Sequence, residues 1–169
     1  MRHTVSIIII LSLFLSTACS IKYSFTGASI PPGTETVSIA EFPNMAPLVN
    51  PMLSNILTEA LKDKFMTQTS LQLVQQNGHL QFEGSIVNYD TKPMAIQAGT
   101  DQAAQNRLTI TIKVKFVNEK DPKANFDTQF SRYEDYSSDQ NLQDVEDSLI
   151  EVIVEQLVDD IFNKAVVNW

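Results

Sequence analysis

Residues 108–116 alternate strictly between apolar and polar side chains, and this pattern constrains the fold more than any other feature of the chain. The apolar positions are Leu108, Ile110, Ile112, Val114 and Phe116, and the polar positions between them are Thr109, Thr111, Lys113 and Lys115. Because successive side chains of a β-strand point to opposite faces, the segment predicts a strand with one buried and one exposed face. A sheet that is covered on one side only is typical of antiparallel pairing.

Three further segments have the composition of strands. The segment Thr36–Phe42 alternates in the same way and is stopped by Pro43. A second strand is predicted over about Leu80–Tyr89, or as far as Gln97, and a third over about Asn125–Tyr133. The sequence therefore predicts about four strands in all, the last three of which follow one another in the chain.

Two segments have helical spacing of their apolar residues. Asn50 and Pro51 are predicted as the N-cap and first-turn residues of a helix whose apolar face runs over Met52–Phe65. A longer helix is predicted over about Leu142–Ala165, with acidic residues in its first turns, where the helix dipole favours anions. Its predicted apolar positions are Leu142, Val145, Leu149, Val152, Ile153, Leu157, Ile161 and Phe162.

The order of these elements is strand, helix, three or four strands, helix. A strand–helix–strand unit needs a right-handed crossover, which places the first helix on one face of the sheet. The second helix is expected on the same face, because only one face of the sheet is apolar. The predicted fold class is therefore α+β, a two-layer sandwich in which a mixed sheet of about four strands carries two helices on one face.

The first nineteen residues have the layout of a bacterial lipoprotein signal. A short basic start precedes an apolar run over Val5–Leu15, which is shorter than the ~20 residues of a membrane span. The segment Leu15–Cys19 resembles a lipobox, in which a cysteine after a small residue becomes the lipidated first residue of the mature chain. Ser16 stands where leucine is usual in that motif. The alternative is an ordinary secretory signal with a chance cysteine.

The predicted domain organisation follows from that cysteine. Residues 1–18 are expected to form a cleaved signal peptide, residues 19–34 a tether lipidated at Cys19, and residues 35–169 a single α+β domain. Each buried CH₂ of an acyl chain contributes ~0.8 kcal/mol, so two or three chains hold a protein on a membrane essentially permanently. By resemblance to Gram-negative sorting signals, Ser20 in place of Asp favours the outer membrane. The lack of acidic residues over Ser20–Ser24 favours its periplasmic side.

Composition excludes several kinds of function. The formal net charge of −8, from 20 acidic and 12 basic residues, argues against a general nucleic-acid binder, because such proteins need many phosphate contacts. One cysteine cannot form an internal disulfide or a cysteine-rich metal site. No nucleotide-binding loop, zinc-protease motif or nucleophile elbow occurs. The sequence thus predicts a protein that is not an enzyme and has no cofactor or metal.

Three remaining features have both a functional and a structural interpretation. His79, the only histidine after the predicted signal peptide, lies beside a turn glycine and is interpreted as a surface turn residue rather than a general base. The carboxylates over Asp127–Asp160 lack EF-hand spacing and are interpreted as a solvated helix face rather than a calcium site. The apolar end Phe162–Trp169 is interpreted as helix-end packing rather than a β-barrel assembly signal.

Basic residues gather on and after the alternating strand. Arg107, Lys113, Lys115, Lys120 and Lys123 are opposed within this stretch only by two acidic residues, Glu119 and Asp121. One interpretation is that exposed strand lysines keep the sheet soluble. The other is a cationic patch for a phosphorylated or acidic ligand, which would act locally because screening limits surface charge effects to ~8–10 Å. By their shared face and charge, Arg107, Lys113 and Lys115 are the candidate contact residues.

The chain as a whole resembles one known family. The segments that carry the resemblance are Tyr23–Ile30, Leu80–Gly84, Asn106–Thr111, Phe130–Tyr133 with Asp135–Tyr136, and Gln156–Leu157 with Asp160–Trp169. Together with the lipobox and the order of elements, they resemble the Bacteroidetes form of LptE, the lipopolysaccharide-assembly lipoprotein family. The resemblance covers essentially the whole predicted mature chain.

The resemblance implies a non-enzymatic function. Members of that family are anchored in the inner leaflet of the outer membrane and sit largely inside the large β-barrel LptD as a plug. The complex inserts lipopolysaccharide into the outer leaflet. Lipopolysaccharide is then the acidic ligand that Arg107, Lys113 and Lys115 are predicted to contact. The alternative is a lipoprotein that activates or scaffolds a periplasmic envelope enzyme, but such proteins usually have long tethers, and here only about fifteen residues separate Cys19 from the first strand.

Overall fold

The computed structural model describes residues 30–48, 50–94 and 104–167. The predicted signal peptide, the lipobox with Cys19 and most of the predicted tether lie outside these residues. The elements in chain order are β1 (Thr36–Ile39), α2 (Leu53–Gln68), β2 (Gln72–Val74), β3 (Leu80–Met94), β4 (Gln105–Asn118), the 3₁₀ turn η1 (Pro122–Ala124), β5 (Phe126–Ser137) and α3 (Leu142–Val166).

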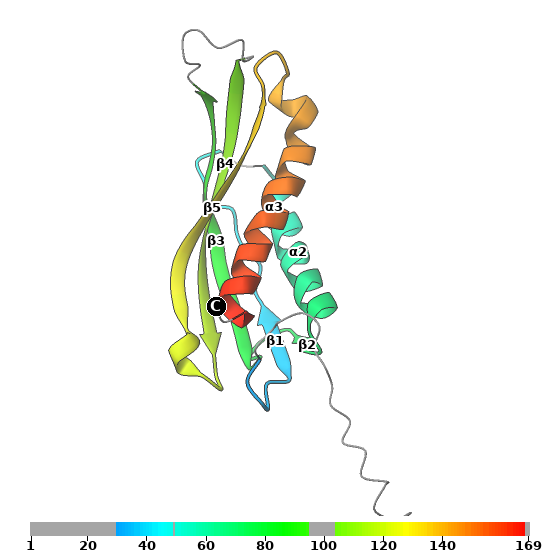
Figure 1. Ribbon diagram of the computed structural model, residues 1–169, viewed down its shortest axis with the longest axis vertical. Helices are drawn as coiled ribbons and strands as arrows, with labels where there is room; N and C mark the ends of the chain where they lie inside the picture. Colours follow the sequence, from blue (N-terminus) through cyan, green and yellow to red (C-terminus); the bar gives the residue numbers. More distant parts are fainter. Residues whose placement is uncertain (1–29, 49, 95–103, 168–169) are drawn as a thin grey trace, which may run out of the picture.

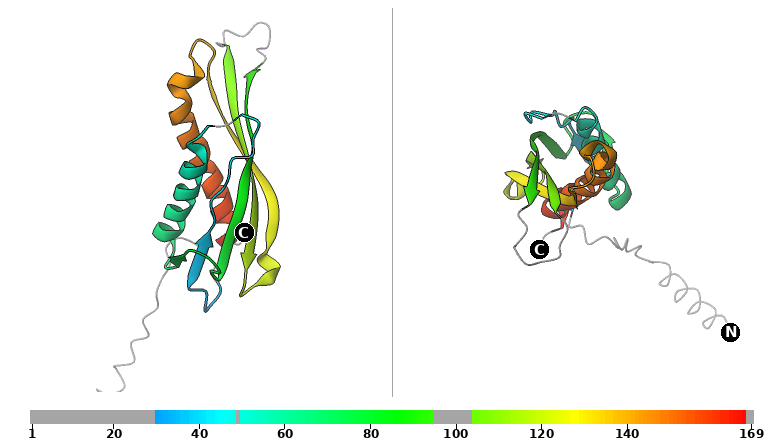
Figure 2. Two further views of the ribbon diagram at one scale, coloured as in Figure 1. Left: turned by 180° about the vertical axis from the view of Figure 1, so that it is seen from behind. Right: turned by 90° about the horizontal axis from the view of Figure 1, so that it is seen from above.

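The five strands form one mixed sheet in the order β2-β1-β3-β4-β5. β1 is parallel to both of its neighbours, and β3, β4 and β5 form an antiparallel meander. Figure 1 shows this sheet as one layer and the two helices as the other, and the view from above in Figure 2 shows both helices on the same face. The predicted α+β fold class is confirmed, with the additional short strand β2.

The alternation that predicted β4 determines which face is buried. Its apolar side chains from Leu108 to Phe116 are at most 1% exposed and lie under the helices. Five phenylalanine rings cross this core from one layer to the other, with successive ring centroids 4.7 to 5.1 Å apart. In spatial order they are Phe162, Phe65, Phe82, Phe116 and Phe126. Such aromatic contacts link α3, α2 and the three long strands into one hydrophobic core.

Several predicted boundaries are corrected by the structure. β1 ends at Ile39 rather than Phe42, because the chain turns toward α2 and the Phe42 amide donates to Thr58 Oγ1 of that helix at 3.1 Å. Asn50 is not the N-cap of α2; the N-cap is Met52, whose amide donates to Asn50 Oδ1 at 2.9 Å. Hydrogen bonds that cannot be inferred from the spacing of apolar residues thus accompany the end of β1 and the start of α2.

The ends of the long elements can be compared with the prediction. β3 ends at Met94, between the two predicted ends Tyr89 and Gln97, and β5 continues beyond its predicted end at Tyr133 to Ser137. Both strands follow β4 along most of its length. α3 runs to Val166, and its buried residues include Ile150, Val154 and Val158, which the predicted apolar face omitted. Val152, which was assigned to that face, is 40% exposed. The helix therefore buries a face rotated slightly from the predicted one.

The connection from β2 to β3 crosses β1 on the face of the sheet that the helices leave open. Gly78 lies against the β1 backbone so closely that a Cβ atom there would be 2.5 Å from the Ser38 amide nitrogen. The Gly78 amide donates to Ser38 Oγ at 3.2 Å, and the His79 amide donates to Thr36 Oγ1 at 3.0 Å. The crossing is thus held by two β1 hydroxyl groups, and it sets the position of β3.

Among the residues that the structure describes, neither helix has the length and apolar character of a membrane-crossing segment.

Candidate functional site on the open sheet face

The three predicted contact residues all come from β4. Arg107, Lys113 and Lys115 lie at odd-numbered positions, opposite in direction to the buried side chains of the same strand. They therefore project from the face that carries no helix. The alternation in the sequence predicted this face correctly. It did not predict the acidic residues of β3 and β5 with which the three side chains pair.

Arg107 is held by the neighbouring strand. Its Nε and Nη2 atoms donate to the two carboxylate oxygens of Asp135 at 2.7 and 2.8 Å, and its guanidinium carbon lies 3.6 Å from the centre of the Tyr133 ring. Hydrogen bonding to Arg107 lowers the pKa of Asp135, and hydrogen bonding to Asp135 raises the pKa of Arg107. Both partners are therefore charged over the whole physiological range, and the pair is fixed in a bidentate geometry.

The two lysines are held more loosely. Lys113 Nζ lies 3.3 Å from an oxygen of Asp127 on β5, and Lys115 Nζ lies 3.4 Å from an oxygen of Glu83 on β3. All four side chains are more than half exposed. Exposed pairs of this kind contribute about 0–1 kcal/mol each and exchange readily with other partners.

The open face is consequently charge-balanced rather than uniformly basic. The register of the three strands places four basic and four acidic residues on it, namely Lys92, Arg107, Lys113 and Lys115 against Glu83, Asp90, Asp127 and Asp135. Lys92 and Asp90 form a further pair at 2.7 Å. A polyanion would have to displace these carboxylates from the lysines. The acidic partners stand at those alternate positions of their own strands that face outward. They could be found from the sequence only once the pairing register of the strands is known.

The other basic residues of the stretch lie in the β4–β5 connection. Lys120 Nζ is 3.8 Å from Glu119, and the Lys123 amide donates to Asp121 Oδ1 in η1. The connection is organised by Asn118, which is buried and whose Oδ1 accepts the amides of Lys120 and Asp121. These two lysines therefore belong to a loop and not to the open face.

His79 has a structural contact. Its Nδ1 atom accepts a hydrogen bond of 3.0 Å from the Glu35 amide at the start of β1, and its own carbonyl accepts the Glu119 amide. The side chain therefore joins the β2–β3 crossing to the beginning of β1. Within the described residues, no three His, Cys, Asp or Glu side chains gather in a way that could hold a metal ion.

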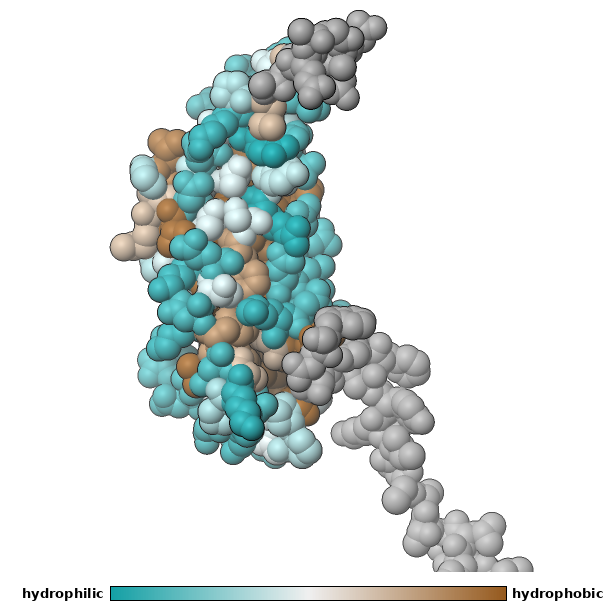
Figure 3. Space-filling view, turned by 60° about the vertical axis from the view of Figure 1, so that its left-hand side comes forward, coloured by the Kyte–Doolittle hydropathy of each residue, from teal (hydrophilic) through white to brown (hydrophobic). Residues whose placement is uncertain are grey.

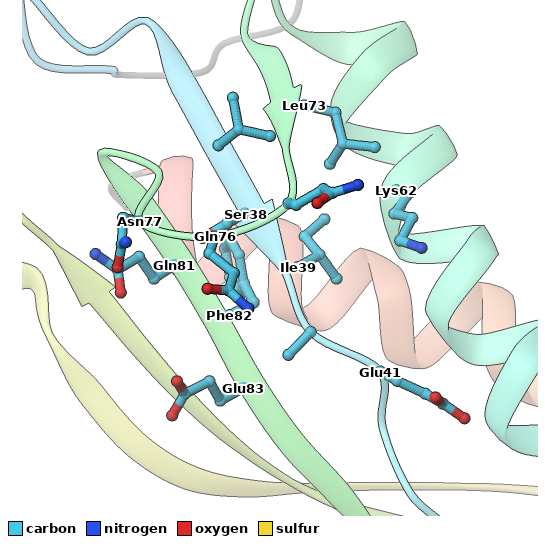
Figure 4. A pocket seen from close by; sticks show the side chains of 13 residues that line it. Ser38, Ile39, Glu41, Lys62, Leu73, Gln76, Asn77, Gln81, Phe82 and Glu83 are labelled. Atoms are coloured by element: carbon cyan, nitrogen blue, oxygen red, sulfur yellow. The ribbon is translucent and has the colours of Figure 1, made fainter.

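A cavity of about 580 Å³ opens where β2 ends beside β1. Figure 4 shows Lys62 of α2 and Leu73 of β2 on one side of it and Gln76, Gln81 and Glu83 on the other. Ile39 and Phe82 also line the cavity, and most of the other lining residues are polar. Lys62 Nζ is bound by Glu59 at 2.8 Å. The cavity thus offers amide and carboxylate hydrogen-bonding groups, without a nucleophile–base pair among its lining residues.

Exposed apolar side chains mark another part of the surface. Met45, Leu48 and Met52, in the connection from β1 to α2, are 70%, 59% and 58% exposed. Figure 3 shows that brown, hydrophobic residues interrupt a mainly teal, hydrophilic surface. The sequence analysis did not identify Met45 and Leu48 as exposed, because residues in a proline-containing connection have no periodicity from which exposure can be inferred. Met52 was expected on the apolar face of the predicted helix, but it is the N-cap of α2 and is exposed.

Comparison with known proteins identifies the family. Residues 34–165 match the family model described as "LptE: Lipopolysaccharide-assembly", which covers most of the chain. The chain belongs to the LptE family. Membership assigns it a role in lipopolysaccharide assembly, and the family consists of non-enzymatic assembly factors. A comparison with curated protein sequences finds no match.

Several solved structures are similar to this LptE family member at low sequence identity. The hypothetical protein CT253 from Chlamydia trachomatis is 8% identical, with a TM-score of 0.54, and the alignment covers 80% of this chain and 99% of that one. A putative neuraminyllactose-binding hemagglutinin homolog from Helicobacter pylori is 12% identical, with a TM-score of 0.52 and coverage of 84% and 88%. The rare lipoprotein B from Shewanella oneidensis is 11% identical, with a TM-score of 0.46 and coverage of 76% and 92%. The first two likenesses support the α+β architecture alone.

Proposed function

We propose that this protein is an outer-membrane lipoprotein of the Bacteroidetes LptE type, which partners an LptD-like β-barrel as its plug and assembly factor. In this function it helps the barrel insert lipopolysaccharide into the outer leaflet. The observation that carries the proposal is the family match, since it extends over residues 34–165 and thus over almost the whole described fold. Neither catalysis nor a cofactor is part of the proposed function.

The proposal includes the membrane anchor. Cleavage before Cys19 and lipidation of that cysteine attach the chain to the periplasmic side of the outer membrane. The proposed tether of residues 19–34 joins directly to β1, which begins at Thr36. At ~3.3–3.6 Å per extended residue, such a tether reaches on the order of 50 Å. The folded domain, residues 35–169 in this proposal, therefore stays close to the membrane that contains the barrel.

The proposal also includes direct contact with lipopolysaccharide through Arg107, Lys113 and Lys115. The lysines are supported by their exposure and by their loose pairs at 3.3 and 3.4 Å, which lipid phosphates could replace. Arg107 is less available, because the bidentate bond to Asp135 and the stacking on Tyr133 hold it in place. Besides contacting the lipid, Arg107 keeps the exposed Tyr133 ring oriented beside the strand that carries the lysines.

Gentle extraction of the outer membrane tests the function. The full-length lipoprotein, tagged at its C-terminus and purified in mild detergent, is expected to co-isolate a large β-barrel, and its depletion is expected to leave lipopolysaccharide below the cell surface. A Cys19→Ala variant, which lacks the lipid anchor, is the control for localisation. Recovery of the anchored protein as a free monomer contradicts the proposal. Recovery with a periplasmic envelope enzyme supports the alternative of an enzyme activator or scaffold.

A further inference from the structure

Charge is divided unequally between the two layers of the fold. The open sheet face carries equal numbers of acidic and basic residues, whereas α3 carries seven acidic residues and one basic residue, Lys164. The acidic residues of α3 are Asp144, Glu146, Asp147, Glu151, Glu155, Asp159 and Asp160. The helical layer therefore repels anionic lipid headgroups and attracts basic surfaces.

A groove of about 510 Å³ runs between the two helices on the outer side of this layer. α2 and α3 lie side by side and run in the same direction (Figure 1). Ile56 and Ala60 of α2 and Val154 and Val158 of α3 supply the apolar lining. The acidic lining residues are Asp63, Glu151, Glu155 and Asp159. The groove is thus apolar along its length and acidic along its rim.

The rim acids differ in how they are partnered. Toward the C-terminal ends of the two helices, Lys64 Nζ lies 2.6 Å from Asp159 and 5.7 Å from the centre of the Phe162 ring. The negative charge of Asp159 is therefore neutralised by a residue of the same chain. Within the part of the chain that the structure describes, Glu151 and Glu155 have no basic side chain at ion-pairing distance, and both are exposed. These two carboxylates are one helical turn apart on the same side of α3 and are available to a partner.

Exposed apolar surface continues from the upper end of the groove. Met52, one helical turn before Ile56, is 58% exposed, and Val152, beside Glu151, is 40% exposed. An apolar surface bordered by acidic residues fits an amphipathic segment that has an apolar ridge flanked by lysine or arginine. A second copy of this chain is a poor occupant, because it would present the same acidic helical layer.

We infer that this groove is the docking surface for a basic amphipathic segment of the β-barrel partner. The inference rests on the proposed function and adds to it the face that contacts the barrel. Lysine or arginine side chains of the partner bind Glu151 and Glu155, and its apolar side chains cover Ile56, Ala60 and Met52. With the helices against the barrel protein, the open sheet face with Lys113 and Lys115 is left free for lipopolysaccharide.

Charge reversal in the complex tests the inference. The tagged full-length lipoprotein is co-expressed with the barrel protein of the same genome as wild type, as Glu151→Lys with Glu155→Lys, and as the matched control Glu35→Lys with Glu119→Lys. The control reverses the same number of exposed carboxylates at the ends of strands β1 and β4. The groove variant is expected to retain roughly tenfold less barrel, equivalent to ~1.4 kcal/mol of binding free energy. The control is expected to retain as much as wild type.

A second variant tests the apolar part of the groove without removing a carboxylate. Ala60→Arg fills the groove with a side chain that Glu151 and Glu155 can bind, and it is expected to displace the barrel in the same way. Circular dichroism and thermal unfolding of each variant show whether the fold is intact. Equal barrel recovery by wild type and both folded groove variants overturns the inference.

Two outcomes separate this inference from the proposed function. If the wild-type lipoprotein itself co-isolates no barrel, the proposed function fails, whatever the groove variants do. If light scattering shows a dimer of the wild-type protein that the groove variant dissociates, the occupant is a second copy, and the inference is overturned while a barrel partnership at another face stands.

Discussion

Arg107 on β4 and Asp135 on β5 are joined by two parallel hydrogen bonds, of 2.7 and 2.8 Å, across the open face of the sheet. The Arg107 guanidinium also lies over the Tyr133 ring. A planar guanidinium is suited to both contacts at once, because its fork of donors matches a carboxylate while its face stacks on an aromatic ring. The pair therefore holds the Tyr133 ring, which is half exposed, in a fixed position on this face.

The first prediction concerns the acidity of Asp135. Because the Arg107 hydrogen bonds lower its pKa below the ordinary value of 3.8, its contribution to folding free energy is present above pH ~4 and is lost as the pH falls through the lowered value. An NMR titration of the Asp135 carboxyl carbon measures this pKa. In Arg107→Lys, which loses the bidentate geometry, the pKa is expected to rise toward 3.8. An identical pKa in the variant would show that the arginine fork has no effect on Asp135.

The second prediction concerns Tyr89, whose hydroxyl group donates a hydrogen bond to Glu146 and so joins β3 to α3. Burial is the main cause that raises the Tyr89 pKa, and the Glu146 hydrogen bond and charge raise it further. Stability from the neutral phenol is fully present below its ordinary pKa of 10.0 and is lost as the pH rises above that value.

An ultraviolet absorbance titration checks this prediction. Tyr89 is expected to give an ionisation step above its ordinary pKa of 10.0, and Tyr89→Phe is expected to remove that late step. Tyr133→Phe is the matched control, because Tyr133 is half exposed and its removal should leave the late step in place. A late step that survives in Tyr89→Phe would assign the raised pKa to another tyrosine.

The third prediction concerns lipopolysaccharide binding. Lys113→Glu with Lys115→Glu is expected to weaken binding of purified lipopolysaccharide, because the variant replaces two exposed cations with anions on the open face. The free energy of unfolding is expected to change by only about 1 kcal/mol or less per lost surface pair. Equilibrium binding of labelled lipopolysaccharide and thermal unfolding measure the two effects.

The matched control for that prediction is Lys120→Glu with Lys123→Glu. It makes the same change in net charge in the β4–β5 connection, where these lysines lie away from the open face. Equal loss of binding in both variants would indicate a general charge effect and not a site. Unchanged binding in the Lys113 and Lys115 variant would remove these residues from the proposed contact.

The sequence could predict those parts of the fold in which apolar residues recur at regular spacing along one element. The period-two pattern of β4 correctly predicted a half-buried strand and the face of Lys113 and Lys115. β2 was not predicted as a strand, because its three residues acquire that conformation only by parallel pairing with β1. Likewise, the carboxylates opposite the lysines, Asp127 and Glu83, come from other strands. Their positions depend on register, which long-range packing determines and a local pattern does not.

The last prediction concerns Gly78, where the β2–β3 connection crosses β1. A Cβ atom at this position would lie 2.5 Å from the Ser38 nitrogen and 2.7 Å from the Val37 carbonyl carbon. Both atoms belong to a strand paired on each side, so the clash can be relieved only by moving the connection or the strand. Gly78→Ala is therefore expected to lower the free energy of unfolding by about 2 kcal/mol or more, measured by urea denaturation.

Gly33→Ala separates this effect from the general cost of replacing a glycine. Gly33 has a φ of +82°, but a Cβ atom added there would meet no described atom within 4 Å, so its substitution carries backbone strain without a clash. It is expected to cost about 1–2 kcal/mol, the penalty for an L-residue in the left-handed region. If Gly78→Ala costs less than Gly33→Ala, the connection is able to move away from β1, and the hydroxyl groups of Thr36 and Ser38 do not fix the crossing.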